Sequence, residues 1–217
     1  MIKKEFKTDF ISPIVICDIE ISNEIKDKEG NWNYENSDIV TLGILYGNKI
    51  TIYQREKKDK LGNWKQAIHE KLKTMPVMFS LNTKMEKYSL KGFLGLNLFI
   101  EEIQFAKGRG CSKDNMFNDL IKNKIINKKD IPIDPFKGDS KLVIESYEKE
   151  DYSSIIAHNK SCLIKEYFIF INRFWFLKKY EIYINSNGWW DAETPFGVEP
   201  IIEKGGDEDY EQNFTNQ

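Results

Sequence analysis

The clearest hydrophobic pattern lies near the start of the chain, in residues 14–21. Four apolar residues in a row are followed by alternating acidic and apolar residues, in the order Asp18, Ile19, Glu20 and Ile21. β-Branched side chains fit a pleated, packed surface, and near-continuous apolar strands are typical of sheets that are covered on both faces. The pattern therefore predicts a buried β-strand that carries two acidic residues.

Two more apolar runs follow this strand, and together they predict a β-hairpin. Residues 39–46 and 49–54 are expected to be strands, and only Gly47 and Asn48 separate them. A Gly-Asn pair between two strand patterns is a signal for a two-residue hairpin turn. The chain is therefore expected to open with three consecutive strands, of which the last two are antiparallel.

Later in the chain the apolar residues follow helical spacing. The longest such pattern runs to about residue 176 and has Asp151 or Ser153 as its N-cap. Shorter helices are expected at 64–73 with Asn63 as N-cap, at 83–93, at 113–122, and up to residue 147 with Asp139 or Ser140 as N-cap. Short strands are expected at 75–81, 96–103 and 180–184.

The order of these elements predicts an α/β fold. Its mixed sheet would hold three antiparallel strands and then parallel strands, with helices on both faces. Residues 1–184 are expected to form one domain. Residues 185–217 are expected to form a C-terminal extension that is acidic and disordered at its end.

The composition says more about where the protein is located than about the chemistry it performs. Of 217 residues 41% are hydrophobic, which allows a sizeable core, and the net charge of -2 favours no class of partner. No apolar run approaches the ~20 residues of a membrane span, and no signal peptide is apparent after Met1. The three cysteines, at positions 17, 111 and 162, form neither a zinc spacing nor a disulfide framework. A reducing, cytoplasmic location without a membrane partner is therefore expected.

Asp18 and Glu20 lie two residues apart, so their side chains point to the same face of the predicted strand. Two like charges on a buried strand are costly unless something compensates them. A divalent cation between the carboxylates would do so. Alternatively, the strand emerges at a sheet edge and water solvates both groups. The spacing alone leaves both possibilities open.

Two further polar groups follow later in the chain. Asn82 comes after the predicted fourth strand, with Glu86 four residues beyond it, and His158 and Asn159 lie in the long predicted helix, with Cys162 after them. Each has an ordinary structural explanation. Asn82 can cap a helix and Glu86 can interact with its dipole. His158 can make one buried hydrogen bond, and Cys162 can be a small core residue.

In this order the residues resemble the motifs of the ribonuclease H-like superfamily of 3′–5′ exonucleases, of the DEDD-like type. The resemblance implies that Asp18 bridges two divalent cations and that Glu20 binds one of them. Glu86 stands where the family usually has an Asp, and the family's Asn is matched by Asn82. His158 falls where the family has a residue that orients or deprotonates water. The implied cofactor is Mg²⁺ or Mn²⁺, which prefer hard oxygen ligands.

The third motif matches the family at Asn159 but departs from it at Cys162, which stands in place of a metal-binding Asp. A neutral thiol is a poor ligand for Mg²⁺. Glu166, one helical turn further on the same face, could supply the missing carboxylate. Asp151, at the start of the helix, is a second possibility.

A basic segment, residues 107–137, is a candidate for contact with nucleic acid. It holds eight Lys or Arg residues against four Asp residues, and it opens with Lys107, Arg109 and Lys113 around two glycines. Glycine lets a backbone approach a phosphate closely, and basic side chains neutralise phosphate charge. Alternatively, these charges form only a solvated face.

The predicted function is a divalent-metal-dependent nuclease that cleaves phosphodiesters at single-stranded DNA or RNA ends, as a 3′–5′ exonuclease does. Asp18, Glu20 and Glu86 would bind the metal, and His158 would act on water. The residues predicted to contact nucleic acid are Asn82, Lys107, Arg109, Lys113 and Asn159. Two alternatives are a catalytically inactive ribonuclease H-like domain that binds nucleic acid or protein, and an unrelated α/β domain whose acidic pair binds a structural ion.

Overall fold

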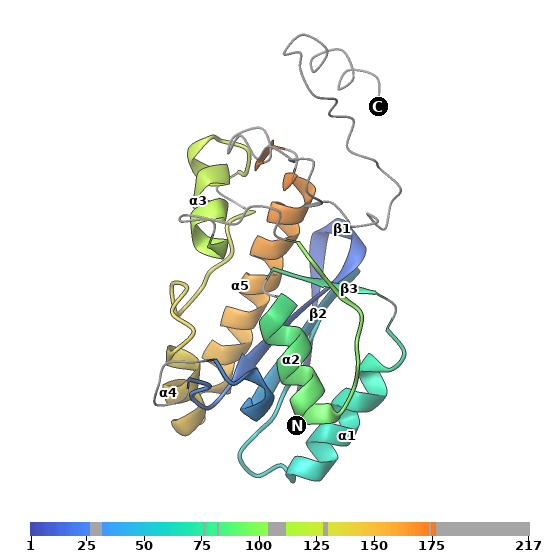
Figure 1. Cartoon of the computed structure of the whole chain (residues 1–217). Helices are drawn as coiled ribbons and strands as arrows, with labels where there is room; N and C mark the ends of the chain where they lie inside the picture. The colour runs from blue at the N-terminus through green and yellow to red at the C-terminus, as the bar shows by residue number, and fades with distance from the viewer. Residues whose placement is uncertain are drawn as a thin grey trace. The chain divides into compact units, whose positions relative to one another are not determined.

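A computed structural model describes most of the chain, and its described residues fall in one compact unit, Met1–Leu177 (Figure 1). The described residues are 1–26, 32–75, 77–81, 83–103, 112–127, 130–173 and 175–176. The predicted strand 180–184, the predicted domain boundary after 184 and the predicted extension 185–217 lie outside the described residues.

In the described part of the chain, four strands form one mixed sheet in the order β2-β1-β3-β4. β1 (Ile2–Ile21) is antiparallel to β2 (Ile39–Gln54) and parallel to β3 (Met78–Ser80). β4 (Ile100–Glu102) pairs in parallel with β3. The fold is therefore mixed α/β, with antiparallel and then parallel pairing as predicted. The order of the four strands as such differs from that of a typical ribonuclease H-like sheet.

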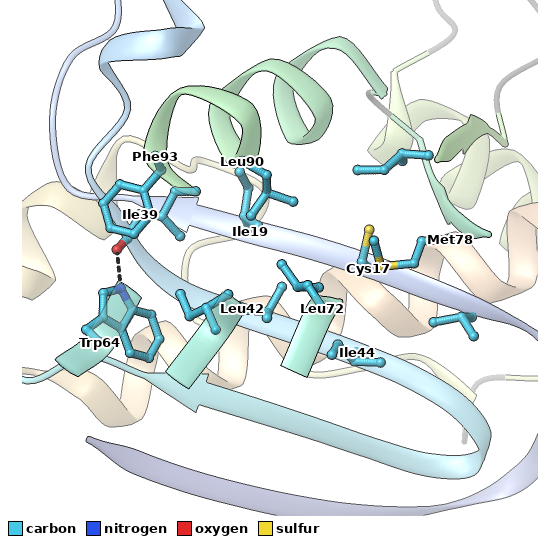
Figure 2. Close-up of a cluster of buried hydrophobic side chains, with 13 residues drawn as sticks. Cys17, Ile19, Ile39, Leu42, Ile44, Trp64, Leu72, Met78, Leu90 and Phe93 are labelled. Atoms are coloured by element: carbon cyan, nitrogen blue, oxygen red, sulfur yellow. Dashed lines mark hydrogen bonds between the residues drawn. The ribbon is translucent and has the colours of Figure 1, made fainter. Parts of the chain in front are cut away.

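β2 contains both strands of the predicted hairpin, because it folds back on itself. Near its two ends, the Arg55 backbone N–H donates to the Val40 carbonyl at 2.8 Å, and the Thr41 hydroxyl donates to Gln54 Oε1 at 2.6 Å. Gly47 has a φ of 59°, a left-handed value that suits the first central residue of a two-residue hairpin turn. Figure 2 shows the ribbon of β2 reversing its direction. The predicted hairpin is confirmed.

β1 is much longer than the predicted strand at 14–21. Its first half alternates between exposed and half-buried side chains and pairs with the second arm of β2, where Ile2 lies opposite Gln54. Its second half pairs with the first arm of β2 and is almost wholly buried. The prediction missed the first half because a half-exposed strand with several charged residues lacks the apolar run that marks a buried strand.

One face of the sheet packs against α1 (Leu61–Leu72) and α2 (Thr83–Leu94) around a buried apolar cluster (Figure 2). Trp64 of α1 is held there by its indole N–H, which donates to the Ile39 carbonyl at 2.8 Å. Burial of a large apolar side chain contributes about 1.5–3 kcal/mol. The odd-numbered residues of β1 that face this cluster are Val15, Cys17 and Ile19.

The opposite face of the sheet packs against α5 (Tyr152–Ile171), so helices cover both faces as predicted. Asp151 caps α5, since its carboxylate accepts a hydrogen bond from the Ser154 N–H at 3.2 Å. Gly43 in β2 permits the close approach of α5. A Cβ at this position would lie far inside the contact distance of Asn159 Oδ1.

The predicted helix boundaries agree with the structure to within a few residues. α2 and α3 (Lys113–Lys122) lie where they were predicted. Two predicted N-caps are wrong, because Asn63 lies inside α1, and Lys141 rather than Asp139 or Ser140 precedes α4 (Leu142–Glu148). α5 ends earlier than predicted. Among the described helices, none is long and apolar enough to cross a membrane.

Candidate metal site

β1 carries Asp18 and Glu20 on the face of the sheet that packs against α5. Both residues are buried, with exposed fractions of 5% and 4%. β1 lies between β2 and β3 and not at an edge of the sheet. The alternative in which water solvates both carboxylates at an edge is therefore wrong, and their charge must be compensated by the protein or by a ligand.

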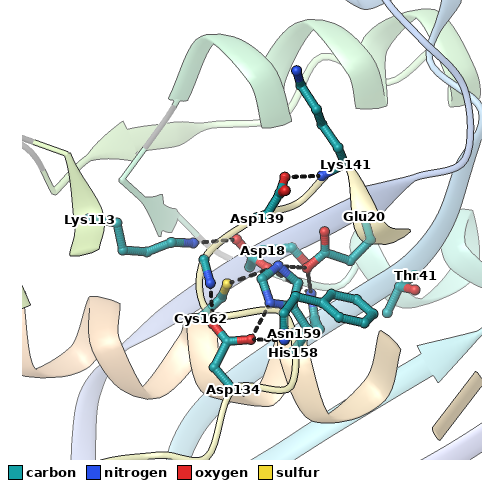
Figure 3. A network of polar contacts seen from close by, with 12 residues as sticks. Asp18, Glu20, Thr41, Lys113, Asp134, Asp139, Lys141, His158, Asn159 and Cys162 are labelled. Carbon is teal, nitrogen blue, oxygen red and sulfur yellow. Dashed lines mark hydrogen bonds and ion pairs between the residues drawn. The ribbon is translucent and has the colours of Figure 1, made fainter. Parts of the chain in front are cut away.

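Asn159 of α5 contacts both carboxylates (Figure 3). Its Nδ2 donates to Asp18 Oδ2 at 2.7 Å, to the Asp18 carbonyl at 3.3 Å and to Glu20 Oε1 at 3.3 Å. The Asn159 side chain is fully buried, and its Oδ1 accepts no hydrogen bond within the described residues. Since the amide group donates to both acids, it fixes their orientation in the site.

The ammonium of Lys113, at the start of α3, lies between carboxylates from two other elements. Lys113 Nζ is 3.2 Å from Asp18 Oδ1 and 3.1 Å from Glu166 Oε1. Burial lowers the pKa of a lysine, but the surrounding carboxylates outweigh this effect and hold the pKa of Lys113 well above its usual value. Glu166, which the sequence offered as a substitute for a carboxylate at Cys162, is thus brought next to Asp18.

Three carboxyl groups of the cluster have raised pKa values. Burial raises the pKa of Glu166 to about 8, and Lys113 opposes only part of this effect. For Glu20, burial and then repulsion from Asp18 raise the pKa well above its ordinary value. Burial, which favours the uncharged carboxyl group, is the largest cause of these shifts, and repulsion from Asp18 adds to it.

Glu86 approaches the same cluster from α2. It is 2% exposed, and its Oε2 has no hydrogen-bond partner within the described residues. Burial, followed by repulsion from Asp18 and Glu166, raises the pKa of Glu86 well above its ordinary value. Asn82, which was predicted to act together with Glu86, lies outside the described residues.

His158 of α5 has its two ring nitrogens in different surroundings (Figure 3). Nδ1 is 2.8 Å from Asp134 Oδ1, whereas Nε2 is 3.8 Å from both Glu20 Oε1 and Cys162 Sγ. Burial lowers the pKa of His158, but the hydrogen bond that Nδ1–H donates to Asp134 and the charge of Glu20 outweigh it, so the pKa is raised. The ring is thus oriented with Nε2 toward the acidic cluster.

Asp134 is held firmly in the position that orients this imidazole. It accepts hydrogen bonds from the backbone N–H groups of Phe136 and Gly138, at 3.0 and 3.1 Å, and from Lys165 Nζ at 2.9 Å. Burial raises the pKa of Asp134, but the hydrogen bonds from His158 and Lys165 outweigh it and hold the pKa well below its usual range. Neither Asp134 nor Lys165 was predicted as a site residue. For Lys165, the sequence did contain a signal, because a lysine among the apolar residues of α5 is unusual.

The cluster contains one tight set of metal donors. Within the described residues, one oxygen of Glu20, one nitrogen of His158 and the sulfur of Cys162 all lie within 4.8 Å of one another. Asp18 and Glu86, the other predicted metal ligands, belong to no group this tight. The second substitute for a carboxylate at position 162, Asp151, is exposed and caps α5.

The residues predicted to contact nucleic acid fall into two groups. Lys113 and Asn159 lie inside the carboxylate cluster, where carboxylate oxygens already engage their nitrogens. Lys107 and Arg109 lie outside the described residues, as does Asn82. Contact of these five residues with nucleic acid stays a prediction.

No family model matches the chain, and no curated protein matches it. Among solved structures, the chain is similar to the family B DNA polymerase from the hyperthermophilic archaeon Pyrobaculum calidifontis, with a TM-score of 0.48 and 10% sequence identity. The match covers 75% of this chain and 24% of the polymerase chain, so this chain spans about a quarter of the polymerase's length. A similarity of this strength carries no argument about function.

Proposed function

We propose that the chain is a metal-dependent phosphodiesterase, and more narrowly a nuclease-type domain that acts on single-stranded nucleic-acid ends. The observation that carries the proposal is a cluster of four buried carboxyl groups, two of which, Asp18 and Glu166, contact the ammonium of Lys113. The four acidic residues are Asp18, Glu20, Glu86 and Glu166. A divalent cation would supply the positive charge that these buried carboxyl groups need in order to ionise.

The donor atoms fit Mg²⁺ or Mn²⁺. Glu86 Oε2 and Glu166 Oε2 are buried without a hydrogen-bond partner within the described residues, which leaves carboxylate oxygens free to act as ligands. Hard carboxylate oxygens are the protein ligands that these two ions prefer. When bound by Asp18, Glu20 and Glu86, such an ion would activate water and neutralise charge on the phosphodiester.

The chain's own residues then have separate roles. Asn159 keeps Asp18 and Glu20 in place through its Nδ2. Asp134 holds His158 through Nδ1, so that Nε2 can take a proton from a water molecule on the Glu20 side. Lys113 reduces repulsion within the cluster and can neutralise part of a phosphate charge.

Two features support the narrower proposal of a ribonuclease H-like 3′–5′ exonuclease-type site. When the two arms of β2 are counted separately, three consecutive antiparallel strands precede the parallel pairing with β3 and β4. Acidic residues follow in the expected order, from β1 through α2 to the late helix α5. The carboxylate that Cys162 lacks would come from Glu166, one turn along the same helix.

The proposal is tested by hydrolysis of labelled single-stranded DNA and RNA with Mg²⁺ or Mn²⁺. The wild type should shorten the strand from its 3′ end, and Asp18→Asn should abolish the reaction. Asp9→Asn, an exposed position on the same strand, should leave the rate unchanged. An equal rate in wild type and Asp18→Asn, or no hydrolysis by the wild type, would refute the proposal.

A second function is favoured by the position of Lys113. Its ammonium bridges Asp18 and Glu166 in the way that a bound cation would, and Cys162 replaces a carboxylate. A domain of this kind would bind nucleic acid or protein without hydrolysing phosphodiesters. Binding of the labelled strand without shortening, at any Mn²⁺ concentration and also in Lys113→Met, would favour this function over the nuclease.

A further inference from the structure

Glu20, His158 and Cys162 bring three different donor atoms to one point beside the carboxylate cluster. Glu20 lies on β1, and the other two lie one turn apart on α5. His158 Nε2 is 3.8 Å from Glu20 Oε1 and 3.8 Å from Cys162 Sγ, and all three donor atoms lie within 4.8 Å of one another. The three residues are at most 4% exposed.

These distances are close to those of a tetrahedral zinc site. With Zn–N near 2.0–2.1 Å and Zn–S near 2.3 Å, tetrahedral angles place neighbouring ligand atoms about 3.4–3.6 Å apart. The two 3.8 Å separations from Nε2 exceed this spacing by a few tenths of an ångström, and the third separation, between the Glu20 oxygen and Cys162 Sγ, is at most 4.8 Å. Rotamer adjustments of Glu20 and Cys162 would bring the three donors to a common ion.

The surroundings of His158 are those of a metal-binding imidazole. Histidine ligands commonly donate their second ring N–H to a carboxylate, which fixes the tautomer and the orientation of the ring. Asp134 fills this position at 2.8 Å from Nδ1. Asp134 is itself fixed by Lys165 and by two backbone N–H groups. Nε2 lies on the side of Glu20 and Cys162 (Figure 3), so with the proton on Nδ1 its lone pair is available to an ion there.

We propose that Glu20, His158 and Cys162 bind one zinc-class divalent cation, with a fourth coordination position open. Mixed nitrogen, sulfur and oxygen donors select Zn²⁺ or Co²⁺ over Mg²⁺. The Cys162 thiol releases its proton to solvent when the ion binds, because the thiolate is the ligand. Burial raises the pKa of the Cys162 thiol to about 12 and Lys113 opposes only part of this effect, so the bound ion itself has to stabilise the thiolate.

This site overlaps the proposed Mg²⁺ or Mn²⁺ site, because both use Glu20 as a ligand. It also uses the nitrogen of His158 that the proposed nuclease reaction requires. Binding of a zinc-class ion would therefore inhibit the hydrolysis supported by Mg²⁺. The inference itself rests on donor geometry alone and holds whether or not the chain is a nuclease.

The test is titration of the metal-free full chain with Co²⁺, followed by optical absorption, and competition with Zn²⁺. The wild type should bind one equivalent and show a sulfur-to-cobalt charge-transfer band that Zn²⁺ abolishes and excess Mg²⁺ does not. Cys162→Ser should lose this band. Cys17→Ala should keep it, because Cys17 faces the apolar cluster on the other side of the sheet.

Asp18→Asn separates this proposal from the nuclease proposal. It should keep the charge-transfer band while it loses hydrolysis supported by Mg²⁺. Circular dichroism checks that each variant is folded, and the wild-type stoichiometry tests the site without any variant. Absence of the band in the wild type, or its persistence in Cys162→Ser, would overturn the proposal.

Discussion

At the scale of single residues, Lys113 controls how much carboxylate charge is compensated when no cation is bound. Lys113→Met removes the charge and keeps most of the side-chain length. Removing one partner of a buried ion pair costs roughly 3–5 kcal/mol. Because 23% of the Lys113 side chain is exposed, we expect a smaller loss in the free energy of unfolding, about 2–3 kcal/mol without metal. Urea denaturation measures this loss.

Saturating Mn²⁺ should restore most of the stability that Lys113→Met loses, since the ion replaces the missing positive charge. Lys122→Met, at the exposed other end of α3, is the matched control and should change stability by less than ~0.5 kcal/mol. If Mn²⁺ stabilises Lys113→Met no more than it stabilises the wild type, the cation does not occupy this cluster.

The raised pKa of Glu166 predicts a pH dependence of stability in the metal-free protein. Its pKa is about 8 in the folded chain and 4.5 in the reference state, so the folded chain holds more protons between these values. Stability should therefore be highest below pH 4.5 with respect to this group and should fall as the pH rises toward 8. His158, whose pKa is also raised, acts in the same direction.

Glu166→Gln should flatten this pH dependence, because the amide does not ionise. Glu145→Gln, an exposed position on α4, should leave it as in the wild type. The measurement is urea denaturation at pH 5.5 and pH 8. A wild type that is equally stable at both pH values would show that the surroundings of Glu166 do not raise its pKa.

Asp134 is expected to act on metal affinity through His158. Asp134→Asn removes the carboxylate that orients the imidazole but leaves all three proposed zinc ligands in place. Loss of such a partner typically weakens metal binding by about 10–100-fold. Competition between Co²⁺ and a chromophoric chelator measures the change. Unchanged affinity would mean that His158 is not a ligand.

At the scale of secondary-structure elements, the site depends on how closely α5 approaches β2. Gly43→Ala would place a methyl group against the Asn159 amide and 2.8 Å from Leu163 Cδ1. Overpacking of this kind costs about 1–3 kcal/mol, and it should also weaken Mn²⁺ binding because Asn159 orients Asp18. Urea denaturation and Mn²⁺ titration of the same variant measure both effects.

Gly62→Ala provides the matched control for Gly43→Ala. Gly62 lies in α1, and a Cβ there meets no atom within 4 Å. Because alanine favours a helix over glycine, we expect a gain of roughly 0.5–1 kcal/mol. Equal effects of the two substitutions would contradict the close packing of α5 on β2.

The elements that a single local pattern marks could be predicted from the sequence. Asp18 and Glu20 stood out because they interrupt an apolar strand, and the hairpin was marked by Gly47 between two strand patterns. The first half of β1 was missed because its pairing with β2 is a long-range contact that leaves no apolar run. The Asn63 cap was wrong because α1 begins at Leu61, three residues earlier than predicted, without a side-chain cap.

At the scale of the whole molecule, the site is assembled from residues that are far apart in the chain. Asn159 and Asp18 are separated by 141 positions and meet through the packing of α5 on the sheet. Asp134 could not have been predicted, because only the folded chain brings its loop to His158. Glu166 was offered as one of two substitutes, and burial beside Lys113 distinguishes it from the exposed Asp151.

Calorimetric titration of the metal-free chain with Mn²⁺ is the most direct test of the carboxylate cluster as a cation site. The wild type should bind Mn²⁺ and release protons, because ligands with a raised pKa must ionise. Asp18→Asn should bind it about tenfold more weakly or worse, and Asp9→Asn as tightly as the wild type. No binding by the wild type, or equal binding by Asp18→Asn, would contradict a metal site on β1.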